Sequence, residues 1–308
     1  MPDNSIVCYA LLLKEYPSEE KMMPLKHIVI ASDFSKYAEY ALQRAISLAE
    51  RHHIPLHFIH VLQQPLSVDF GQYLSEQPKD FLSLEKETLD KLSVLIMKYS
   101  TNVSVNLSVL AGRAADEITQ YTEQNQGTLI IAGAQGQYYI HEYVLGTTSS
   151  YLIEQGKTPV LLIKKEPCFS YKRIIIATDF SKPSKKAIEF TFKCFPDAQF
   201  QLLHVVDIFN NQNLKGKSVD MFESNTKNIM EQLDSFLKEC HVKYDQFEKK
   251  IMGGYLADTI ILQSKNWNAD LLAFGAQGHS KLHYLMTGSV AKRLLQLSYI
   301  DMLVVPPA

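Results

Sequence analysis

The chain has 308 residues, enough for one large domain or two of ordinary size, and 46% of them are hydrophobic, which is enough for a packed core. Its formal net charge at pH 7 is only -2, and acidic and basic residues are interleaved without a long basic run. We therefore expect no binding surface for nucleic acid and none for an anionic membrane.

The first 23 residues are predicted to be an N-terminal extension outside the folded domains. Their apolar run, residues 6 to 13, lacks the basic start and the cleavage site of a signal peptide, and an added edge strand is the alternative interpretation. No apolar stretch of the sequence approaches the roughly 18 to 20 residues of a membrane-spanning helix. The cysteines are widely spaced, without a disulfide or metal pattern, so we expect a cytoplasmic protein. They are Cys8, Cys168, Cys194 and Cys240.

From residue 24 onward the sequence repeats itself once. KHIVIASDFSK at residues 26–36 returns as KRIIIATDFSK at 172–182, FIHV at 58–61 as LLHV at 202–205, and GAQG at 133–136 unchanged at 275–278. A duplication of about 140 residues explains all three matches in their order. We predict one domain over residues 24–166 and a second over 171–308, held close together by the short segment around Pro167.

Each half alternates short apolar runs with longer amphipathic stretches. Continuous apolar runs such as residues 128 to 132 are typical of parallel strands buried on both faces by crossover helices. Ser35 and Ser181 are predicted to cap the helices that follow, and Pro183 suits the first turn of its helix. We therefore expect two tandem, doubly wound α/β domains. The predicted strands cover residues 27–31, 56–62, 103–110, 128–132, 159–163, 173–177, 199–206, 247–252, 270–274 and 302–305.

A glycine pattern follows the fourth predicted strand of each half: Gly-x2-Gly-x9-Gly-Thr in the first and Gly-x2-Gly-x9-Gly-Ser in the second. Glycines at the carboxyl end of a parallel strand let the backbone turn with positive φ and approach a ligand closely. The last glycine opens the next helix, where free N–H groups and the helix dipole favour an anion. The pattern predicts two phosphate-binding turns, formed by Gly133, Gly136, Gly146, Thr147 and Thr148 and by Gly275, Gly278, Gly288 and Ser289.

Polar residues border these predicted turns. Asp33 and Asp179 follow the first strand of each half. They could accept hydrogen bonds from a ribose or an adenine amino group, or they could only shape the start of the next helix; the sequence leaves both roles open. The residues of the second x9 loop are either phosphate contacts or solvated side chains. They are His279, Lys281 and His283.

The Asp-Phe-Ser after the first strand and the GxxGx9G[S/T] pattern after the fourth resemble the ATP-binding class of the universal stress protein family, in tandem over residues 24 to 306. The resemblance implies a five-stranded parallel sheet in each half, with strand order 3-2-1-4-5. It also implies that the final strands pair, here between the two halves of one chain, so that the chain is an intramolecular pseudo-dimer. A further homodimer stays open.

The resemblance also implies a ligand and its contacts. The ligand would be ATP, or AMP or ADP, with Mg²⁺ held mainly by the nucleotide. By position, Asp33 and Asp179 would contact the adenosine end, and the glycines with Thr147 and Ser289 would hold the phosphates. The adenine slot would be lined by Val61 and Val205.

The sequence departs from the family at two points. Ala31 and Ala177 stand two residues before each aspartate, where the family often has proline. The first turn reads Gly-Thr-Thr, whereas the second, Gly288-Ser289-Val290, has the more usual Gly-Ser-Val.

Efficient catalysis is not indicated. The sequence has no Walker lysine motif, no kinase catalytic loop, no acidic pair beside the glycines to hold magnesium, and no G-x-S-x-G elbow. We expect a stress-response binding or signalling module whose conformation or partners respond to an adenine nucleotide. The alternatives are a slow ATPase and a scaffold whose pockets are empty or hold another small ligand.

Overall fold

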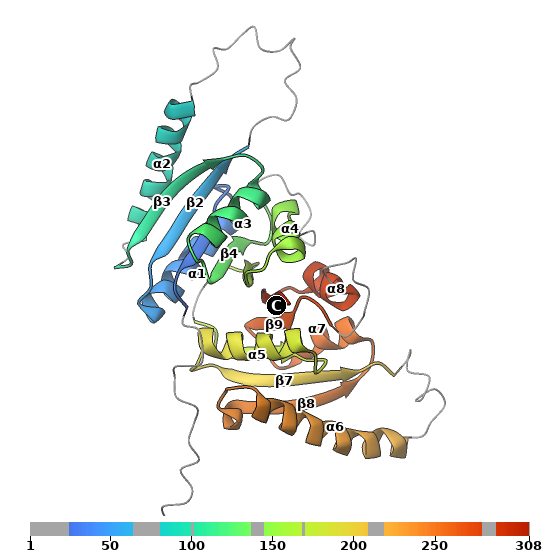
Figure 1. Ribbon diagram of the computed structural model, residues 1–308. Coiled ribbons are helices and arrows are strands. Elements are labelled where there is room, and N and C mark those ends of the chain that lie inside the picture. The colour runs from blue at the N-terminus through green and yellow to red at the C-terminus, as the bar shows by residue number, and fades with distance from the viewer. Residues whose placement is uncertain are drawn as a thin grey trace, which may run out of the picture.

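Figure 1 shows the computed structural model of the chain, which describes residues 25–63, 81–99, 102–136, 145–167, 170–208, 219–278 and 288–307. The strands of these ranges form one ten-stranded sheet in the order β3-β2-β1-β4-β5-β10-β9-β6-β7-β8. Some expectations fall outside the described residues. They are the N-terminal extension, the second-loop residues His279, Lys281 and His283, and Cys8 and Cys168.

The first half of the chain alternates strands and helices in the predicted order. Its strands are parallel and lie in the order 3-2-1-4-5. The elements are β1 (Ile28–Ala31), α1 (Lys36–His52), β2 (Leu56–Leu62), α2 (Phe81–Lys98), β3 (Val105–Ala111), α3 (Ala114–Gln124), β4 (Leu129–Gly133), α4 (Thr147–Gln155) and β5 (Val160–Ile163).

The second half repeats this arrangement, again with parallel strands in the order 3-2-1-4-5. Its elements are β6 (Arg173–Ala177), α5 (Lys182–Cys194), β7 (Gln199–Val206), α6 (Val219–Glu239), a short 3-10 helix (Tyr244–Gln246), β8 (Phe247–Gly253), α7 (Leu256–Asn266), β9 (Leu271–Gly275), α8 (Ser289–Leu297) and β10 (Asp301–Val305). All ten predicted strands are present, and their ends differ from the prediction by at most two residues.

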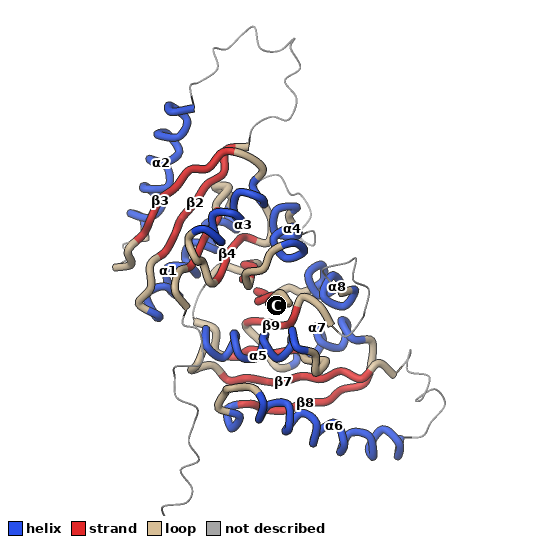
Figure 2. Tube along the Cα trace, viewed as in Figure 1, coloured by secondary structure: helices blue, strands red, loops and turns tan. Residues whose placement is uncertain are grey.

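Helices cover both faces of the sheet (Figure 2). Side chains of α1, α2, α5 and α6 share one hydrophobic core, and those of α3, α4, α7 and α8 share the other. Successive residues of a strand point to opposite faces, so Ile28 and Ile30 of β1 lie in the first core and Val29 in the second. This confirms the doubly wound fold. None of the described helices is long and apolar enough to cross a membrane.

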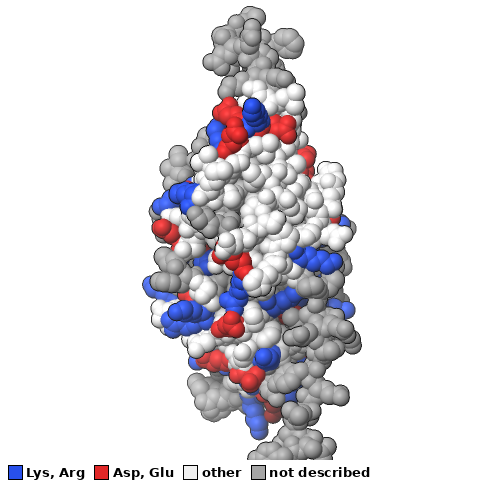
Figure 3. Space-filling view, turned by 90° about the vertical axis from the view of Figure 1, so that its left-hand side faces the viewer, with Lys and Arg blue, Asp and Glu red and all other residues white. Residues whose placement is uncertain are grey.

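The charged side chains are mixed on the face shown in Figure 3. Lysine and arginine residues lie among aspartate and glutamate residues there, and a stretch with few charges of either sign lies below the mixed charges at the top of that face. A single-sign patch of the kind that attracts nucleic acid is therefore not formed on this face.

The two halves join edge to edge through their final strands. β5 and β10 are antiparallel neighbours, with Leu161 opposite Leu303, as the family resemblance implied. Asp301, the first residue of β10, is 2% exposed. Its Oδ1 accepts the backbone N–H of Lys164 at 2.7 Å, and its Oδ2 accepts the hydroxyl of Tyr171 at 2.5 Å. The segment that connects the halves is thus tied to the sheet at both of its ends.

Lys164 adds a second contact across this seam. Its ammonium group donates to the carbonyl oxygens of Ser298 at 2.6 Å and Leu295 at 3.0 Å, at the carboxyl end of α8. Burial lowers the pKa of Lys164 to about 8, although the nearby Asp301 acts in the opposite direction. The first half therefore touches the helix whose other end borders the second glycine turn.

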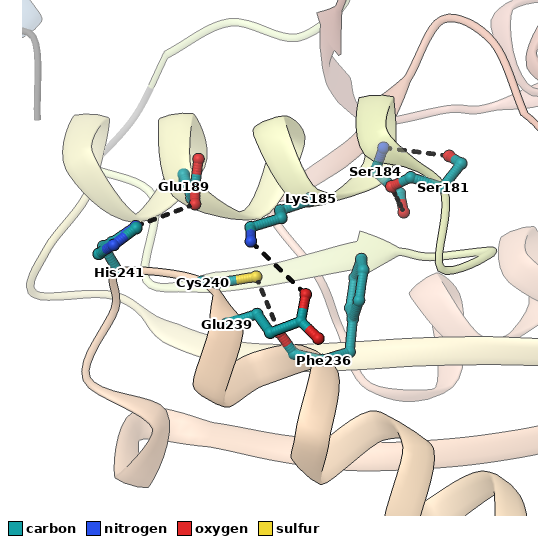
Figure 4. A network of polar contacts seen from close by, with 8 residues as sticks. All are labelled: Ser181, Ser184, Lys185, Glu189, Phe236, Glu239, Cys240 and His241. Atoms are coloured by element: carbon teal, nitrogen blue, oxygen red, sulfur yellow. Dashed lines mark hydrogen bonds and ion pairs between the residues drawn. The ribbon is translucent and has the colours of Figure 1, made fainter.

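The first two helices of each half are linked by ion pairs of opposite polarity. Glu39 of α1 pairs with Lys98 of α2, whereas Lys185 of α5 pairs with Glu239 of α6 at 3.6 Å (Figure 4). Glu39 and Lys185 hold equivalent positions, each four residues after a capping serine. As a result, α2 carries a charge opposite to that of α1 at this contact, and α6 carries a charge opposite to that of α5.

Candidate functional site

The turn after the first strand of each half is held by its own side chains. Oδ1 of Asp33 accepts the N–H of Ser35 at 3.0 Å, and Oγ of Ser35 accepts the N–H of Ala38 at 3.2 Å, which confirms the predicted cap of α1. Between them, Phe34 has a left-handed φ of 62°. Asp33 therefore shapes this turn, whatever else it contacts. The second half repeats the arrangement with Asp179, Phe180, Ser181 and Ser184.

The first two glycines of each pattern are required by close packing inside the protein. A Cβ atom on Gly133 would lie 2.8 Å from the backbone of Tyr37 in α1. One on Gly136 would lie 2.7 Å from Oδ2 of Asp33. Glycine at these positions lets the helix and the carboxylate come close to the end of β4. The equivalent approaches in the second half are 2.8 Å for Gly275 with Pro183 and 2.5 Å for Gly278 with Asp179.

The expected positive φ angles are not found at the glycines of the pattern. Among the described glycines, only Gly112 and Gly254, in the turns before α3 and α7, have positive φ, at 150° and 155°. The left-handed residues beside the crevices are Phe34 and Phe180 instead. That part of the prediction was wrong: Gly146 and Gly288 have φ angles of -61° and -67°, in the extended region that any residue can adopt.

The third glycine of each pattern is different, because the fold leaves room beside it. Among the described residues, a Cβ atom on Gly146 would meet no atom closer than 3.5 Å, and one on Gly288 none closer than 3.9 Å. Both residues are N-caps in the extended region, and neither α4 nor α8 has a side-chain capping hydrogen bond. Each glycine donates its own N–H to the end of the preceding strand, Gly146 to Ala134 at 2.8 Å and Gly288 to Ala276 at 3.0 Å. Within the described part of the chain, the first N–H groups of both helices therefore have no capping side chain.

All the site residues predicted from the sequence line two cavities, one in each half, at the carboxyl ends of β1 and β4 and of β6 and β9. The cavities measure about 560 Å³ in the first half and about 340 Å³ in the second. Strand order reverses between these strands, which is where open parallel sheets bind ligands. The first crevice is lined by Asp33, Val61, Gly133, Gly136, Gly146, Thr147 and Thr148. The second is lined by Asp179, Val205, Gly275, Gly278, Gly288, Ser289 and Val290.

Two histidines beside the crevices were not predicted as site residues. His60 of β2 lines the first crevice, and its Nδ1 donates to the carbonyl oxygen of Ser32 at 2.7 Å. Burial lowers the pKa of His60, so the ring is neutral at pH 7 and its Nε2 is an acceptor. His204 makes the same bond to Thr178 at 2.9 Å in the second half. The signal was present, since both histidines belong to the repeated His-Val dipeptide, but the sequence could not show which way the rings point.

Comparison with known protein families identifies the family of this chain. Residues 24–164 and 170–306 each match the model of the Universal stress protein family. The chain belongs to the universal stress protein family.

Curated universal stress proteins match about half of this chain at a time. One from Methanocaldococcus jannaschii is 28% identical over 142 residues, which are 46% of this chain and 82% of that protein. A putative one from Staphylococcus aureus is 24% identical over 152 residues, which are 47% of this chain and 87% of that protein.

Solved universal stress proteins support the fold. One from Archaeoglobus fulgidus aligns with a TM-score of 0.66 over 93% of this chain and 100% of its own length, at 16% identity, which bears on the fold alone. Another is a complex with cAMP, at 16% identity and a TM-score of 0.35, over 46% of this chain and 98% of its own.

The two crevices of this universal stress protein differ in polarity. Thr147, Thr148 and Ser149 open α4 in the first, and Oγ of Ser149 donates to the carbonyl oxygen of Gly133 at 2.9 Å. In the second, Ser289 is followed by Val290 and an alanine. Among the described residues, no group of three or more His, Cys, Asp or Glu side chains could hold a metal ion. The crevices thus offer backbone N–H groups, hydroxyl groups, a carboxylate and an apolar wall.

Proposed function

We propose that this universal stress protein binds an adenine nucleotide, ATP or alternatively AMP or ADP, in its two crevices. The observation that carries the proposal is the room beside Gly146 and Gly288. The packing of the described residues accounts for the other glycines of the pattern, but it does not demand glycine at Gly146 and Gly288. A ligand that lies against the backbone at Gly146 and Gly288 would explain why both positions are glycine.

The chemistry of the two helix starts favours phosphate. The first N–H groups of α4 and α8 have no side-chain cap, and the positive end of the helix dipole lies at the same place. The hydroxyl groups of Thr147 and Ser289 stand in the first turn and can donate to the same anion. A lysine is not needed for this kind of binding. Any Mg²⁺ would be held mainly by the phosphates of the nucleotide.

The other end of each crevice suits a nucleoside. Val61 and Val205 belong to the apolar wall, against which a planar base can lie. Asp33 and Asp179 stand beside the glycines, where a carboxylate can accept hydrogen bonds from ribose hydroxyl groups. Volumes of about 560 and 340 Å³ are in the range of small-molecule sites.

We assign the protein a binding or signalling role in the stress response, in the cytoplasm, rather than rapid turnover. The sequence has no Walker lysine motif and no kinase catalytic loop, which favours this role over a slow ATPase. The slow ATPase would be the correct function if the protein hydrolysed ATP steadily above a control without protein and if Asp179→Ala abolished this hydrolysis.

Isothermal titration calorimetry with ATP, ADP and AMP tests the proposal. Gly146→Val and Gly288→Val should each remove one binding event, and the double variant should bind none. Gln155→Val, at the exposed far end of α4, is the matched control and should bind as the unchanged protein does. Full binding by the double variant, with its thermal unfolding unchanged, would refute the site.

A further inference from the structure

A second cavity adjoins the crevice of the second half. It measures about 440 Å³, and we call it the side cavity. It shares Leu256, Ser289 and Val290 with the crevice, so the two hollows meet at the start of α8. The remaining residues of its lining are Asp207, Tyr255, Ala257, Asp258 and Arg293. A ligand whose phosphates lie at Ser289 could therefore continue into the side cavity.

The polar wall of the side cavity is held in place. The guanidinium of Arg293 in α8 donates to both carboxylate oxygens of Asp258 in α7, at 3.0 and 3.1 Å through Nη2. A bidentate pair of this kind fixes the plane and the direction of the arginine. Tyr255, the N-cap of α7, is 57% exposed at the same wall. The side cavity thus combines a fixed cation with an aromatic ring that ligands can reach.

The first half arranges the same residue types differently. Arginine and tyrosine have exchanged places: Arg113 holds the position of Tyr255, and Tyr151 holds that of Arg293. The guanidinium of Arg113 lies 4.5 Å from the ring centre of Tyr151, and it also pairs with Asp116 at 3.6 Å. There the cation of the protein itself covers the ring. The two halves therefore present different surfaces beside equivalent crevices.

We propose that the side cavity binds the second nucleoside of a dinucleoside polyphosphate whose phosphate chain lies at the start of α8. This inference rests on the proposed nucleotide binding of the second crevice. The base of the second nucleoside stacks on Tyr255, and its ribose hydroxyl groups donate to Asp207. Arg293 is held by Asp258, and its remaining N–H groups can donate to the phosphate chain.

Calorimetry on the full chain carrying Gly146→Val tests the inference, since only the second crevice should then bind. The titrants are ATP and diadenosine tetraphosphate. We expect diadenosine tetraphosphate to bind about 10-fold more tightly than ATP, the gain that one base stacked on an aromatic side chain gives. Tyr255→Ala should remove this gain and leave the affinity for ATP within about twofold, whereas Tyr255→Phe keeps the ring and should keep the gain.

Tyr151→Ala in the first half is the matched control and should change neither affinity. Equal affinity for the two titrants, or a gain that survives Tyr255→Ala, overturns the side cavity as a nucleoside site while the proposed binding of ATP stands. Loss of the gain in Tyr255→Phe as well would show that the hydroxyl group of Tyr255 carries the gain, and this would overturn stacking on the ring. If neither titrant binds, the proposed function fails together with this inference.

Discussion

Asp33 and Gly136 are in direct contact at the mouth of the first crevice, where Oδ2 of the aspartate lies 2.7 Å from the point that a Cβ atom on the glycine would occupy. We expect Gly136→Ala to displace this carboxylate and to lower the free energy of unfolding by about 1 kcal/mol. The cost should nearly vanish when Asp33→Ala has removed the carboxylate. Urea unfolding of the two single variants, the double variant and the unchanged protein measures the coupling. A coupling of zero would mean that the glycine is not there to make room for Asp33.

Gly275 and Gly288 belong to one pattern but should respond to substitution in opposite ways. A Cβ atom on Gly275 would lie 2.8 Å from the backbone of Pro183, which cannot give way cheaply, so Gly275→Ala should cost about 1 to 3 kcal/mol of stability. Gly288→Ala should leave stability within about 0.5 kcal/mol and weaken the binding of ATP. Thermal unfolding and calorimetry on both variants separate the two effects. Equal destabilisation by both substitutions would contradict the assignment of Gly288 to a ligand.

The fold was predictable because its signals are local and occur twice. Strands such as β4 are continuous apolar runs, and the aspartates and glycines that line the crevices stand at strand ends in both halves. Once the strands were known to be parallel, all of these residues had to meet at one edge of the sheet. The family resemblance added the pairing of β5 with β10, for which the residue pattern of a single strand holds no information.

What the sequence could not show is how each residue is used. Gly133 and Gly146 look alike in the pattern, but a Cβ atom on Gly133 would clash with the backbone of α1, whereas one on Gly146 would make only ordinary contacts with the described residues. Only interatomic distances separate these cases. The stacking of Arg113 on Tyr151 could not be predicted for a related reason, since Arg113 precedes α3, Tyr151 belongs to α4, and their contact depends on side-chain directions.

Lys164 should make stability depend on pH in the alkaline range. Its pKa is about 8 in the folded protein and 10.5 is the ordinary value, so between these values the unfolded chain binds more protons than the folded one. The free energy of unfolding should therefore rise with pH across this window. From pH 7 to 10, we expect the unchanged protein to gain about 2 kcal/mol relative to Lys164→Met, which cannot titrate. Urea unfolding at several pH values checks this, and parallel curves for the two proteins would show that Lys164 keeps its ordinary pKa.

The ion pair between α5 and α6 has the opposite polarity to the pair between α1 and α2. Reversing the charge of Lys185 should therefore lower the stability of the second half. Lys185→Glu places two carboxylates where Lys185 and Glu239 now pair at 3.6 Å (Figure 4), and we expect a loss of about 0.5 to 1 kcal/mol, because the pair is partly exposed. Adding Glu239→Lys restores the attraction and should recover the loss. Urea unfolding at low ionic strength measures both steps, and 1 M salt should shrink them. Should the double reversal be as unstable as Lys185→Glu alone, the contact between α5 and α6 would depend on packing around Lys185 and not on its charge.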